Sequence, residues 1–412
     1  MKVKHYNVSK IVFGEQSSYK NNILTINKDE LKAYSLQGLN GYELEVHLTE
    51  PGEKTRIIHI TDTVVPAWKS NGSTFPGWTE GDNNCGVGEV HHLEGVAVIQ
   101  TCKYPGIQEG IVDMYGNGSS YSKFSKLKNI VVTVNLQNEE YTKLQLAKDL
   151  KLIILRAAEF LGYLTKDALA DDIEKVSLCE TNNDLPNVGY AYFIQAQGPL
   201  RNVHIFAEDC TKMKPRFMQA EQIIDGALVS GNYIIACQKN PTYFHQKNPV
   251  IESMLKRHGK DLNFKGVILS TESSLLEEKK ENARLISEIA IEKGISGIVI
   301  TQEGGGHADV DLMLTLEACE NAGIKTVILT NEIAGPDGSL PPLVSISDSA
   351  DAIVTNGNND EIIIVDAMEK AIGGDEILDG KHNALDSFET SLGIMYTSTN
   401  QLGANFMTTI SL

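Results

Sequence analysis

The chain reads Gly266-Val-Ile-Leu-Ser270, Ser296-Gly-Ile-Val-Ile-Thr301 and Lys325-Thr-Val-Ile-Leu-Thr330 at three places in its C-terminal half, and these short apolar runs decide its fold. Amphipathic stretches at Glu277 to Lys293 and Asp309 to Ala322 separate them, with apolar residues at helical spacing. Strands that alternate with helices of this length predict right-handed βαβ crossovers and a parallel sheet. We therefore expect an α/β domain with a doubly wound, Rossmann-like parallel sheet in this part of the chain.

Two further apolar runs, at residues 352–355 and 361–365, extend the pattern, and we expect each to add a strand. Ligands of doubly wound sheets bind outside the carboxyl ends of the strands. In this chain those ends are followed by Ser270-Thr271, by Thr301 to His307 and by Thr330 to Pro336. These loops are where we expect the chemistry to lie.

The N-terminal half is less regular. It contains short strand-like runs and a Gly-, Pro- and Ser-rich loop from residue 67 to residue 85, and a helix is expected from about Asn138 to Leu161, with Gly162 as its stop. We expect an N-terminal α+β domain over residues 1–225, joined to a C-terminal α/β domain over residues 226–412.

The composition is ordinary for a globular protein, with 42% hydrophobic and 22% charged residues. A net charge of −18 disfavours nucleic acid and anionic membranes as partners. The first residues lack the apolar core of a secretion signal, and no apolar run approaches the roughly 18 residues that a spanning helix needs. We expect a cytoplasmic protein.

The six cysteines are scattered, without a CxxC pair or a Cys/His cluster at zinc spacing, so we expect neither disulfides nor a structural metal. His91 and His92 are neighbours on an expected strand and would point to opposite faces, which disfavours a shared metal ion. Cys237 stands apart from the other cysteines. It ends an apolar, strand-like run within residues 226–249, directly before a polar turn.

Glu303-Gly304-Gly305-Gly306 follows one of the expected strands and precedes a helix. Such a sequence can form a nest of backbone N–H groups at a helix N-terminus, which would bind a substrate carboxylate. We favour the alternative interpretation, a tight turn that needs positive φ angles, because Asp309 and Asp311 nearby would weaken anion binding. A dinucleotide fingerprint would need a further glycine at position 309, so no nucleotide cofactor is expected.

Nine short segments along the chain form one ordered set, namely Val12-Phe-Gly-Glu15, Gly95-Val-Ala-Val98, Gly106-Ile-Gln-Glu-Gly-Ile-Val-Asp-Met114, Tyr121-Ser-Lys-Phe-Ser-Lys126, Gly189-Tyr-Ala-Tyr-Phe-Ile-Gln-Ala-Gln-Gly198, Asn240-Pro-Thr-Tyr-Phe-His-Gln-Lys-Asn-Pro-Val250, Arg257-His-Gly-Lys-Asp261, Glu303-Gly-Gly-Gly306 and Ala322-Gly-Ile-Lys-Thr-Val327. Together they resemble the proproteins of the glycine, sarcosine and betaine reductases (component B, α/β precursor) and, more distantly, of D-proline reductase. Each segment alone is weakly specific, and their order and spacing carry the resemblance.

The resemblance implies that Cys237 is the point where the chain cuts itself and that this cysteine becomes a covalent pyruvoyl group. The cysteine sulfur would attack the carbonyl of Ala236, which requires an activated thiol and donors for the oxyanion. His245 is the nearest imidazole in the sequence and a candidate base, and it can equally be an ordinary turn histidine. Thr242 and Tyr243 are weaker candidates for contacts with substrate, as is the segment Glu303 to Gly306.

The resemblance also implies a small amino-acid substrate, whose C–N bond the pyruvoyl carbonyl activates. The reducing selenocysteine would come from a selenoprotein subunit of component B, and selenoprotein A and an acetyl-phosphate-forming component would act downstream. We therefore expect a hetero-oligomer. The residues do not choose among glycine, sarcosine, betaine and D-proline.

Two alternatives remain open at this stage. Asn84-Cys85 is the only Asn-Cys pair in the chain, and it lies in a Gly-rich loop, so Cys85 could be the cleavage point in place of Cys237. The chain could also be an unprocessed homologue that keeps Cys237 as a thiol and serves as a non-catalytic substrate-binding or assembly subunit.

Overall fold

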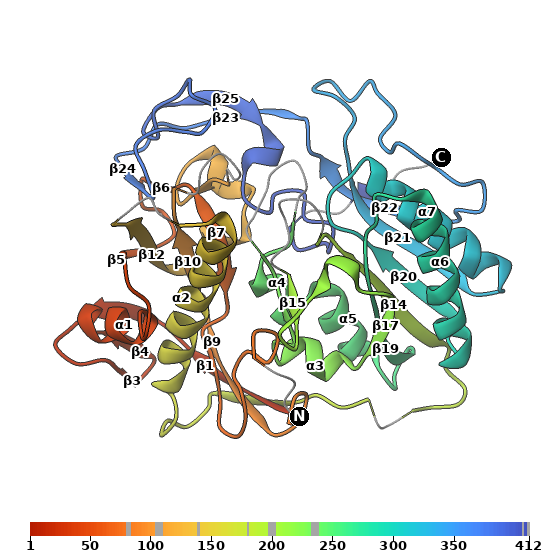
Figure 1. Ribbon diagram of the computed structural model, residues 1–412, viewed down its shortest axis with the longest axis horizontal. Coiled ribbons are helices and arrows are strands. Elements are labelled where there is room, and N and C mark those ends of the chain that lie inside the picture. The colour runs from red at the N-terminus through yellow and green to blue at the C-terminus, as the bar shows by residue number, and fades with distance from the viewer. Residues whose placement is uncertain are drawn as a thin grey trace.

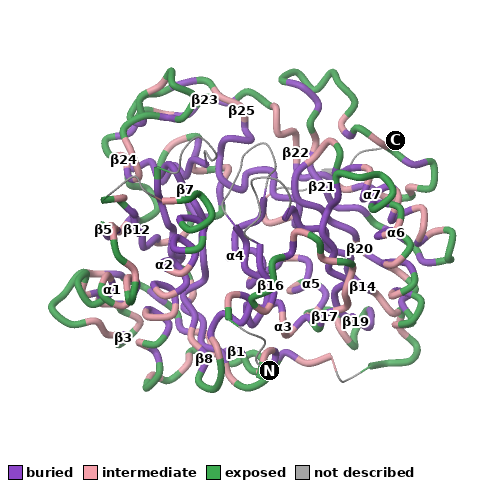
Figure 2. The backbone as a smooth tube through the Cα atoms, in the orientation of Figure 1, coloured by how far each residue is buried: buried purple, intermediate pink, exposed green. Residues whose placement is uncertain are grey.

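The structure is a computed structural model and describes residues 1–79, 84–103, 110–137, 141–178, 181–196, 203–231 and 239–405, with the backbone of 408–409. The chain forms a mixed α/β fold with several sheets (Figure 1). N-terminal elements, red to yellow, lie on one side of the view, and the largest sheet lies on the other. Figure 2 shows that the strands of this sheet are buried along most of their length.

The largest sheet has seven strands in the order β17-β19-β14-β20-β21-β22-β26. Its five inner strands are parallel to one another, and the two edge strands are antiparallel to their neighbours. The strands are β17 (Arg216–Met218), β19 (Asn263–Thr271), β14 (Asn187–Ile194), β20 (Gly297–Thr301), β21 (Lys325–Glu332), β22 (Ile353–Asn358) and β26 (Thr408–Thr409). The strands predicted at 266–270, 296–301, 325–330 and 352–355 are confirmed. The boundary at residues 225/226 stays a prediction, and β14 precedes it in the sequence.

Helices cover both faces of this sheet because its strands are apolar on both sides. Helices α6 (Leu276–Glu292) and α7 (His307–Asn321) pack on the face that contains Ala191 and Phe193. Tyr190 and Tyr192 point to the opposite face and pack with residues of α3 (Ala220–Ile224), α4 (Thr242–Gln246) and α5 (Pro249–Arg257). Both helices predicted after residue 276 are therefore confirmed.

The strand predicted at residues 361–365 is confirmed, but it does not extend the parallel sheet as the pattern indicated. These residues form β23 (Ile362–Val365), which pairs antiparallel with β25 (Phe388–Ser391) in a separate two-stranded sheet. Ile362 and Ile364 are 49% and 55% exposed, whereas Ile363 and Val365 are buried. A strand with one buried face suits a surface ribbon, whereas an inner parallel strand is buried on both faces.

The N-terminal half contains two four-stranded sheets, in the orders β5-β12-β10-β7 and β13-β1-β9-β8. Their strands are β1 (Lys2–Asn7), β5 (Tyr42–Thr49), β7 (Ile60–Val64), β8 (Ala67–Lys69), β9 (Glu89–Glu94), β10 (Val96–Thr101), β12 (Lys128–Leu136) and β13 (Asp172–Lys175). Smaller sheets use β2 (Lys10–Phe13), β3 (Ser18–Lys20), β4 (Ile23–Ile26), β6 (Thr55–Ile57), β11 (Val112–Asp113), β15 (His204–Ile205), β16 (Glu208–Asp209), β18 (Leu228–Val229) and β24 (Lys370–Ile372). Helix α1 (Lys28–Ser35) packs on α2 (Lys143–Tyr163), and short 3-10 helices lie at Asn117–Ser120, Lys123–Lys126, Cys210–Lys212 and Leu392–Ile394.

The two halves of the chain are joined by buried contacts. Strand β24 pairs in parallel with β6, which brings residues 370–372 beside residues 55–57. Arg56 is fully buried and donates hydrogen bonds to the carbonyl oxygens of Asp366, Ala384 and Asp386. A guanidinium in this position needs all of its partners, because an unpaired buried charge is costly. The C-terminal segment therefore helps to hold the N-terminal half in place.

Helix α2 differs from the prediction at both ends. It begins at Lys143, because Thr142 is its N-cap and accepts a hydrogen bond from the backbone N–H of Gln145 at 3.2 Å. It continues through Gly162, the predicted stop, to Tyr163. A Cβ at position 162 would lie 2.2 Å from the carbonyl carbon of Ala67, so the glycine allows the helix to approach β8 closely. Within the described ranges, no helix combines the length and the apolar character needed to cross a membrane.

Substitution of Gly162 by Ala is expected to lower the free energy of unfolding by about 1–3 kcal/mol, because the added methyl group overpacks the contact with β8. Gly297→Ala is the matched control, since the nearest atom to its added Cβ lies at 3.7 Å. Urea unfolding of both variants measures the difference. Equal stability of the two variants would contradict the close-packing role of Gly162.

Candidate functional site

A buried polar network lies at the carboxyl ends of β14, β19 and β20. Cys237 and Ala236, the predicted processing point, lie outside the described residues. The first described residues after them are Lys239 and Asn240, both of which are buried. Asn240 follows Cys237 by three positions, and three residues of chain span at most about 11 Å. Lys239 and Asn240 are therefore the described residues nearest to Cys237 in the sequence.

Glu303 is the centre of this network. It lies two residues after the end of β20, beyond Gln302, and is fully buried. One carboxylate oxygen accepts the backbone N–H of Gln195 at 2.8 Å, and the other accepts the backbone N–H of Asn240 at 2.9 Å. Burial raises the pKa of Glu303 to about 7, against the opposing effects of the Lys239 charge and of the two N–H groups. The carboxyl group can thus gain or lose a proton near neutral pH.

Glu272 lies beside Glu303 and follows β19. Its Oε1 atom accepts the backbone N–H of Glu303 at 3.2 Å. Burial raises the pKa of Glu272 well above its usual value, and the negative charges of Asp311 and Glu303 raise it further. Both effects favour the protonated form of Glu272 more than in an exposed carboxyl group.

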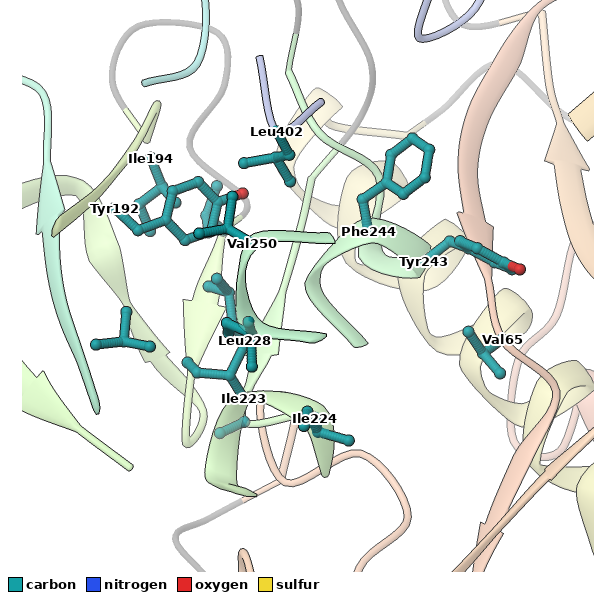
Figure 3. Packing of buried hydrophobic residues seen from close by; sticks show 14 of the residues in the cluster. Val65, Tyr192, Ile194, Ile223, Ile224, Leu228, Tyr243, Phe244, Val250 and Leu402 are labelled. Carbon is teal, nitrogen blue, oxygen red and sulfur yellow. The ribbon is translucent and has the colours of Figure 1, made fainter. Parts of the chain in front are cut away.

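Tyr192, on β14, connects Asn240 to His245. Its hydroxyl group lies 3.0 Å from Nδ2 of Asn240 and 3.0 Å from Nδ1 of His245. The Asn240 amide donates to the phenol oxygen, which leaves the phenol proton to be donated to the imidazole. The Asn240 side-chain oxygen in turn accepts a hydrogen bond from Asn400. Figure 3 shows Tyr192 near Leu402, which belongs to the same C-terminal segment as Asn400.

His245, the predicted base, is fully buried in α4. Burial lowers its pKa to about 3, and the positive charges of Lys239 and Lys151 act in the same direction. The imidazole is therefore neutral at pH 7, and its Nδ1 atom already pairs with Tyr192. A general base works best when its pKa lies near the operating pH. The assignment of His245 as the base stays a prediction, and the structure offers Glu303 as a competitor.

Thr242 joins the network to the N-terminal half. Its hydroxyl donates to Asp62 at 2.6 Å and its backbone N–H donates to the same carboxylate at 3.0 Å. Asp62, on β7, also forms a buried ion pair with Lys151 of α2. The Thr242 hydroxyl accepts the backbone N–H of Ser230 at 3.1 Å. Its hydrogen bonds thus fix the start of α4, and contact with substrate stays a prediction.

Tyr243 is separated from this polar network. Its ring packs against Phe124 with the ring centres 5.2 Å apart, within the hydrophobic cluster. In Figure 3 its side chain points away from Tyr192. The predicted role of Tyr243 in binding substrate is untested, and packing accounts for its position.

Gly304, Gly305 and Gly306 form a tight turn between β20 and α7. Gly304 has φ of 74° and Gly306 has φ of 77°, a region that favours glycine. The carbonyl oxygen of Gly304 points inward and accepts hydrogen bonds from Gln302 at 3.2 Å and Gln401 at 2.9 Å. Backbone geometry thus accounts for the glycines at 304 and 306, while binding of a substrate carboxylate stays a prediction.

The second cysteine candidate lies in a different environment. The carbonyl oxygen of Asn84, which precedes Cys85, accepts a hydrogen bond from the buried Lys69 ammonium at 2.6 Å. Lys69 is also paired with Asp225, which accepts the backbone N–H of Gly86 at 2.7 Å. The Cys85 sulfur is half-buried and lies 3.8 Å from the carbonyl oxygen of Gln222. These contacts hold the loop against α3, so Cys85 must be tested beside Cys237.

Of the two adjacent histidines, His91 has structural partners. Nδ1 of His91 lies 2.9 Å from the Thr165 hydroxyl, and its ring stacks on Tyr6. Burial lowers the pKa of His92 to about 3. Among the residues that the structure describes, no three His, Cys, Asp or Glu side chains are placed to hold a metal ion.

Several residues of the network were missed from the sequence. Glu272 directly follows Thr271, at a strand end where chemistry was expected, and that position was the available signal. Tyr192 and Asn240 lie within segments of the family resemblance but carry no spacing that indicates a contact. Asp62 reaches Thr242 across 180 positions of sequence, a separation that no local pattern reports.

Comparison with known proteins defines the family. The family model for glycine/sarcosine/betaine reductase component B subunits matches residues 1–409. The chain is 33% identical to the glycine reductase complex component B subunits alpha and beta of Peptoclostridium acidaminophilum, over 97% of each chain. It is 34% identical to the sarcosine reductase complex component B subunit alpha of that organism, again over 97% of each chain.

A third relative is the betaine reductase complex component B subunit alpha of Peptoclostridium acidaminophilum. It is 34% identical over 92% of this chain and 88% of its own length. No solved structure gives a significant match. The whole-length matches define a class of oxidoreductase subunits that act on C–N bonds. This chain belongs to the family of glycine/sarcosine/betaine reductase component B subunits.

Substitution of Tyr192 by Phe is expected to lower the free energy of unfolding by about 1–3 kcal/mol, because Asn240 and His245 each lose a buried partner. Tyr190→Phe is the matched control on the same strand. Its hydroxyl pairs with Thr301 at 2.7 Å, and its loss is expected to cost about 1 kcal/mol. Denaturant unfolding of the two variants checks the order, and a larger loss in Tyr190→Phe would contradict this account of the network.

The neutral His245 predicts a pH dependence of stability. Between its folded pKa of about 3 and its usual value of 6.5, the unfolded chain binds more protons than the fold, so stability falls as the pH drops through this range. From pH 7 to pH 5 this group alone is expected to remove about 2 kcal/mol. His245→Gln should therefore lose less stability than the parent protein over that interval. Unfolding measured at both pH values tests this, and parallel losses would show that His245 is not held neutral.

Proposed function

We propose that this chain is the pyruvoyl-bearing, self-processing subunit of a reductase that binds glycine or an N-methylated glycine and activates its C–N bond. The observation that carries the proposal is the bond from the Asn240 N–H to the buried carboxylate of Glu303, three residues after Cys237. This hydrogen bond holds the chain that follows the cysteine at the carboxyl ends of the parallel strands, which is where α/β proteins bind ligands. Membership of the reductase component B family supports the same assignment.

The residues at the carboxyl ends of these strands are suited to surround a covalent keto group and to bind a small amino acid. Glu303, Glu272 and Tyr192 are all buried, so water is largely excluded from their surroundings. The Lys239 charge partly balances that of Glu303. When present, a pyruvoyl group supplies an electron-withdrawing carbonyl that weakens the C–N bond of a bound amine. The protein's own contribution is to orient the amine, to hold its proton and to keep water away.

Reduction requires partners, because this chain contains no selenocysteine position. The three relatives are named as components of reductase complexes, which supports a hetero-oligomer. We place a selenoprotein subunit of component B beside this chain as the source of the attacking selenol. Selenoprotein A and an acetyl-phosphate-forming component would act downstream. The cytoplasmic location expected from the sequence stays a prediction.

Intact mass spectrometry of the purified protein tests the processing step. We expect two chains, residues 1–236 and residues 237–412, with the second carrying a modified first residue. Cys237→Ala should remain a single chain of 45.1 kDa, because it lacks the attacking sulfur. Cys319→Ala removes a thiol buried among the residues that α7 packs on the sheet, and it should be cleaved as the parent protein is.

Cys85→Ala distinguishes the two candidate cysteines. Cleavage that persists in Cys237→Ala and disappears in Cys85→Ala would move the processing point to the Asn84-Cys85 peptide. A single full-length chain in the parent protein, isolated from an active complex, would overturn self-processing. The chain would then be the unprocessed subunit that binds substrate or supports assembly.

A further inference from the structure

The connection between β21 and β22 lacks the helix that a parallel sheet normally has at this point. Neighbouring parallel strands are usually joined by a helix that crosses back over the sheet. Here β21 ends at Glu332 and β22 begins at Ile353, and residues 333–352 between these parallel strands contain no helix. The connection starts beside the glycine turn after β20, where a Cβ added to Gly305 would collide with the side chain of Ile333. A connection of this length without helix or strand usually has a function of its own.

Hydrogen bonds within the chain hold this connection in place. The backbone N–H of Val344 donates to Asp309 at 2.8 Å, and the hydroxyl of Ser347 donates to Glu317 at 2.8 Å. Both acceptors belong to α7. Leu343 is buried in the cluster that α7 forms with the sheet. The exposed part of the connection therefore rests on a fixed support, and a partner that binds it does not have to order it first.

The connection exposes several large apolar side chains. Four of them are exposed, namely Ile333, Leu340, Val344 and Ile346. Single exposed apolar residues are common on protein surfaces. In this connection, however, the N–H of Ile333 donates to the carbonyl oxygen of Pro342 at 3.1 Å, and the N–H of Leu340 donates to that of Ala334 at 3.0 Å, so its two arms lie side by side. Apolar groups that gather on a soluble surface mark an interaction site.

The same part of the chain is strongly acidic. Residues 326–369 contain eight Asp or Glu residues and no Lys, Arg or His. Three of these carboxylates are exposed and form no ion pair with a side chain that the structure describes, namely Asp337, Asp348 and Glu361. The carboxylate of Asp360 accepts the N–H of Gly335 at 2.9 Å, which holds residues 360–361 against the connection. Residues 333–348 and 360–361 thus form one acidic and apolar surface, which we call the carboxyl-end face.

The charge of the carboxyl-end face decides which partner suits it. A second copy of this chain carries the same net charge of −18, and a symmetric dimer would place the acidic face against itself. Like charges that oppose each other across an interface are strongly unfavourable. An anionic membrane is repelled for the same reason. A protein surface with lysine and arginine around apolar side chains complements this face in both respects.

The size of the apolar group also fits such a partner. A standard protein–protein interface buries about 800 Å² on each side, which is more than four side chains supply. In these interfaces apolar side chains form the centre and polar groups form the rim. The carboxyl-end face offers both parts. It also lies at the end of the sheet at which α/β proteins bind their ligands.

We propose that the carboxyl-end face is the docking surface for a partner subunit of the reductase complex, which presents lysine and arginine side chains around an apolar centre. The inference rests on the proposed function for the identity of this partner, the selenoprotein subunit of component B. It adds the surface of this chain that the partner covers. A subunit bound there lies at the carboxyl ends of the parallel strands.

The affinity of the purified protein for the selenoprotein subunit of component B tests the apolar centre. The subunit is produced with cysteine in place of selenocysteine, and binding is measured by sedimentation velocity. Leu340 and Val344 are 59% and 72% exposed, so Leu340→Ser/Val344→Ser removes apolar surface without opening a cavity. This variant should raise the Kd about 10- to 100-fold. Leu169→Ser is the matched control, because Leu169 is 94% exposed and follows α2 in the N-terminal half, and it should keep the parental Kd.

Charge reversal tests the acidic part of the carboxyl-end face. Asp337→Lys/Asp348→Lys should lower the association rate constant about 10-fold at low salt and weaken its dependence on ionic strength. Glu43→Lys/Asp167→Lys makes the same change in net charge at two exposed positions of the N-terminal half. This control should associate at close to the parental rate. Surface plasmon resonance at low and at high salt measures the difference.

The outcomes separate this inference from the proposed function. Parental binding by both carboxyl-end variants would overturn the docking surface and leave the proposed function standing, since intact mass tests cleavage independently. Equal losses in the variants and their controls would also contradict it. If the parent protein does not bind the selenoprotein subunit, the partner is wrongly assigned. A dimer of the parent protein that Leu340→Ser/Val344→Ser abolishes would assign the face to a second copy of this chain instead.

Discussion

The structure depends on how one buried carboxylate is held. Glu303 receives backbone N–H groups from Gln195 and Asn240, which belong to segments on either side of the predicted processing point. Removal of a charge from water is costly unless it is paired and hydrogen-bonded, so this carboxylate requires both donors. These two hydrogen bonds fix the ends of two chain segments at the carboxyl ends of the sheet strands. Tyr192, Asn240 and Asn400 extend the same constraint by hydrogen bonds among themselves.

The N-terminal half helps to position this end of the sheet through a buried ion pair. Asp62 accepts both hydrogen bonds from Thr242, and its negative charge is balanced by the buried Lys151 of α2. A sheet and a helix that are distant in sequence therefore position the start of α4. After cleavage before residue 237, β14 would still lie between β19 and β20, so the two products would share one sheet. Processing would create a new chain end without separating the halves of the fold.

The sequence predicted the parallel strands well because they are buried on both faces and read as continuous apolar runs. It predicted the strand β23 but not its place in a separate surface ribbon, where exposed and buried isoleucines alternate. It also took Gly162 for a helix stop, although the glycine accommodates the backbone of Ala67 on another element. The strand-end rule located Glu303 and the region of Glu272. The contacts of Asp62 and Tyr192 are tertiary, and no local pattern reports them.

The central claim is that the thiol of Cys237 becomes a keto group at a new chain end. The most direct measurement is hydrazide labelling of the mature protein together with alkylation of its thiols, followed by peptide mapping. The account predicts that the hydrazide is attached to the first residue of the chain that begins at position 237, and that no alkylated Cys237 is found. An alkylated Cys237 within an uncut chain, with no hydrazide-reactive peptide, would contradict it.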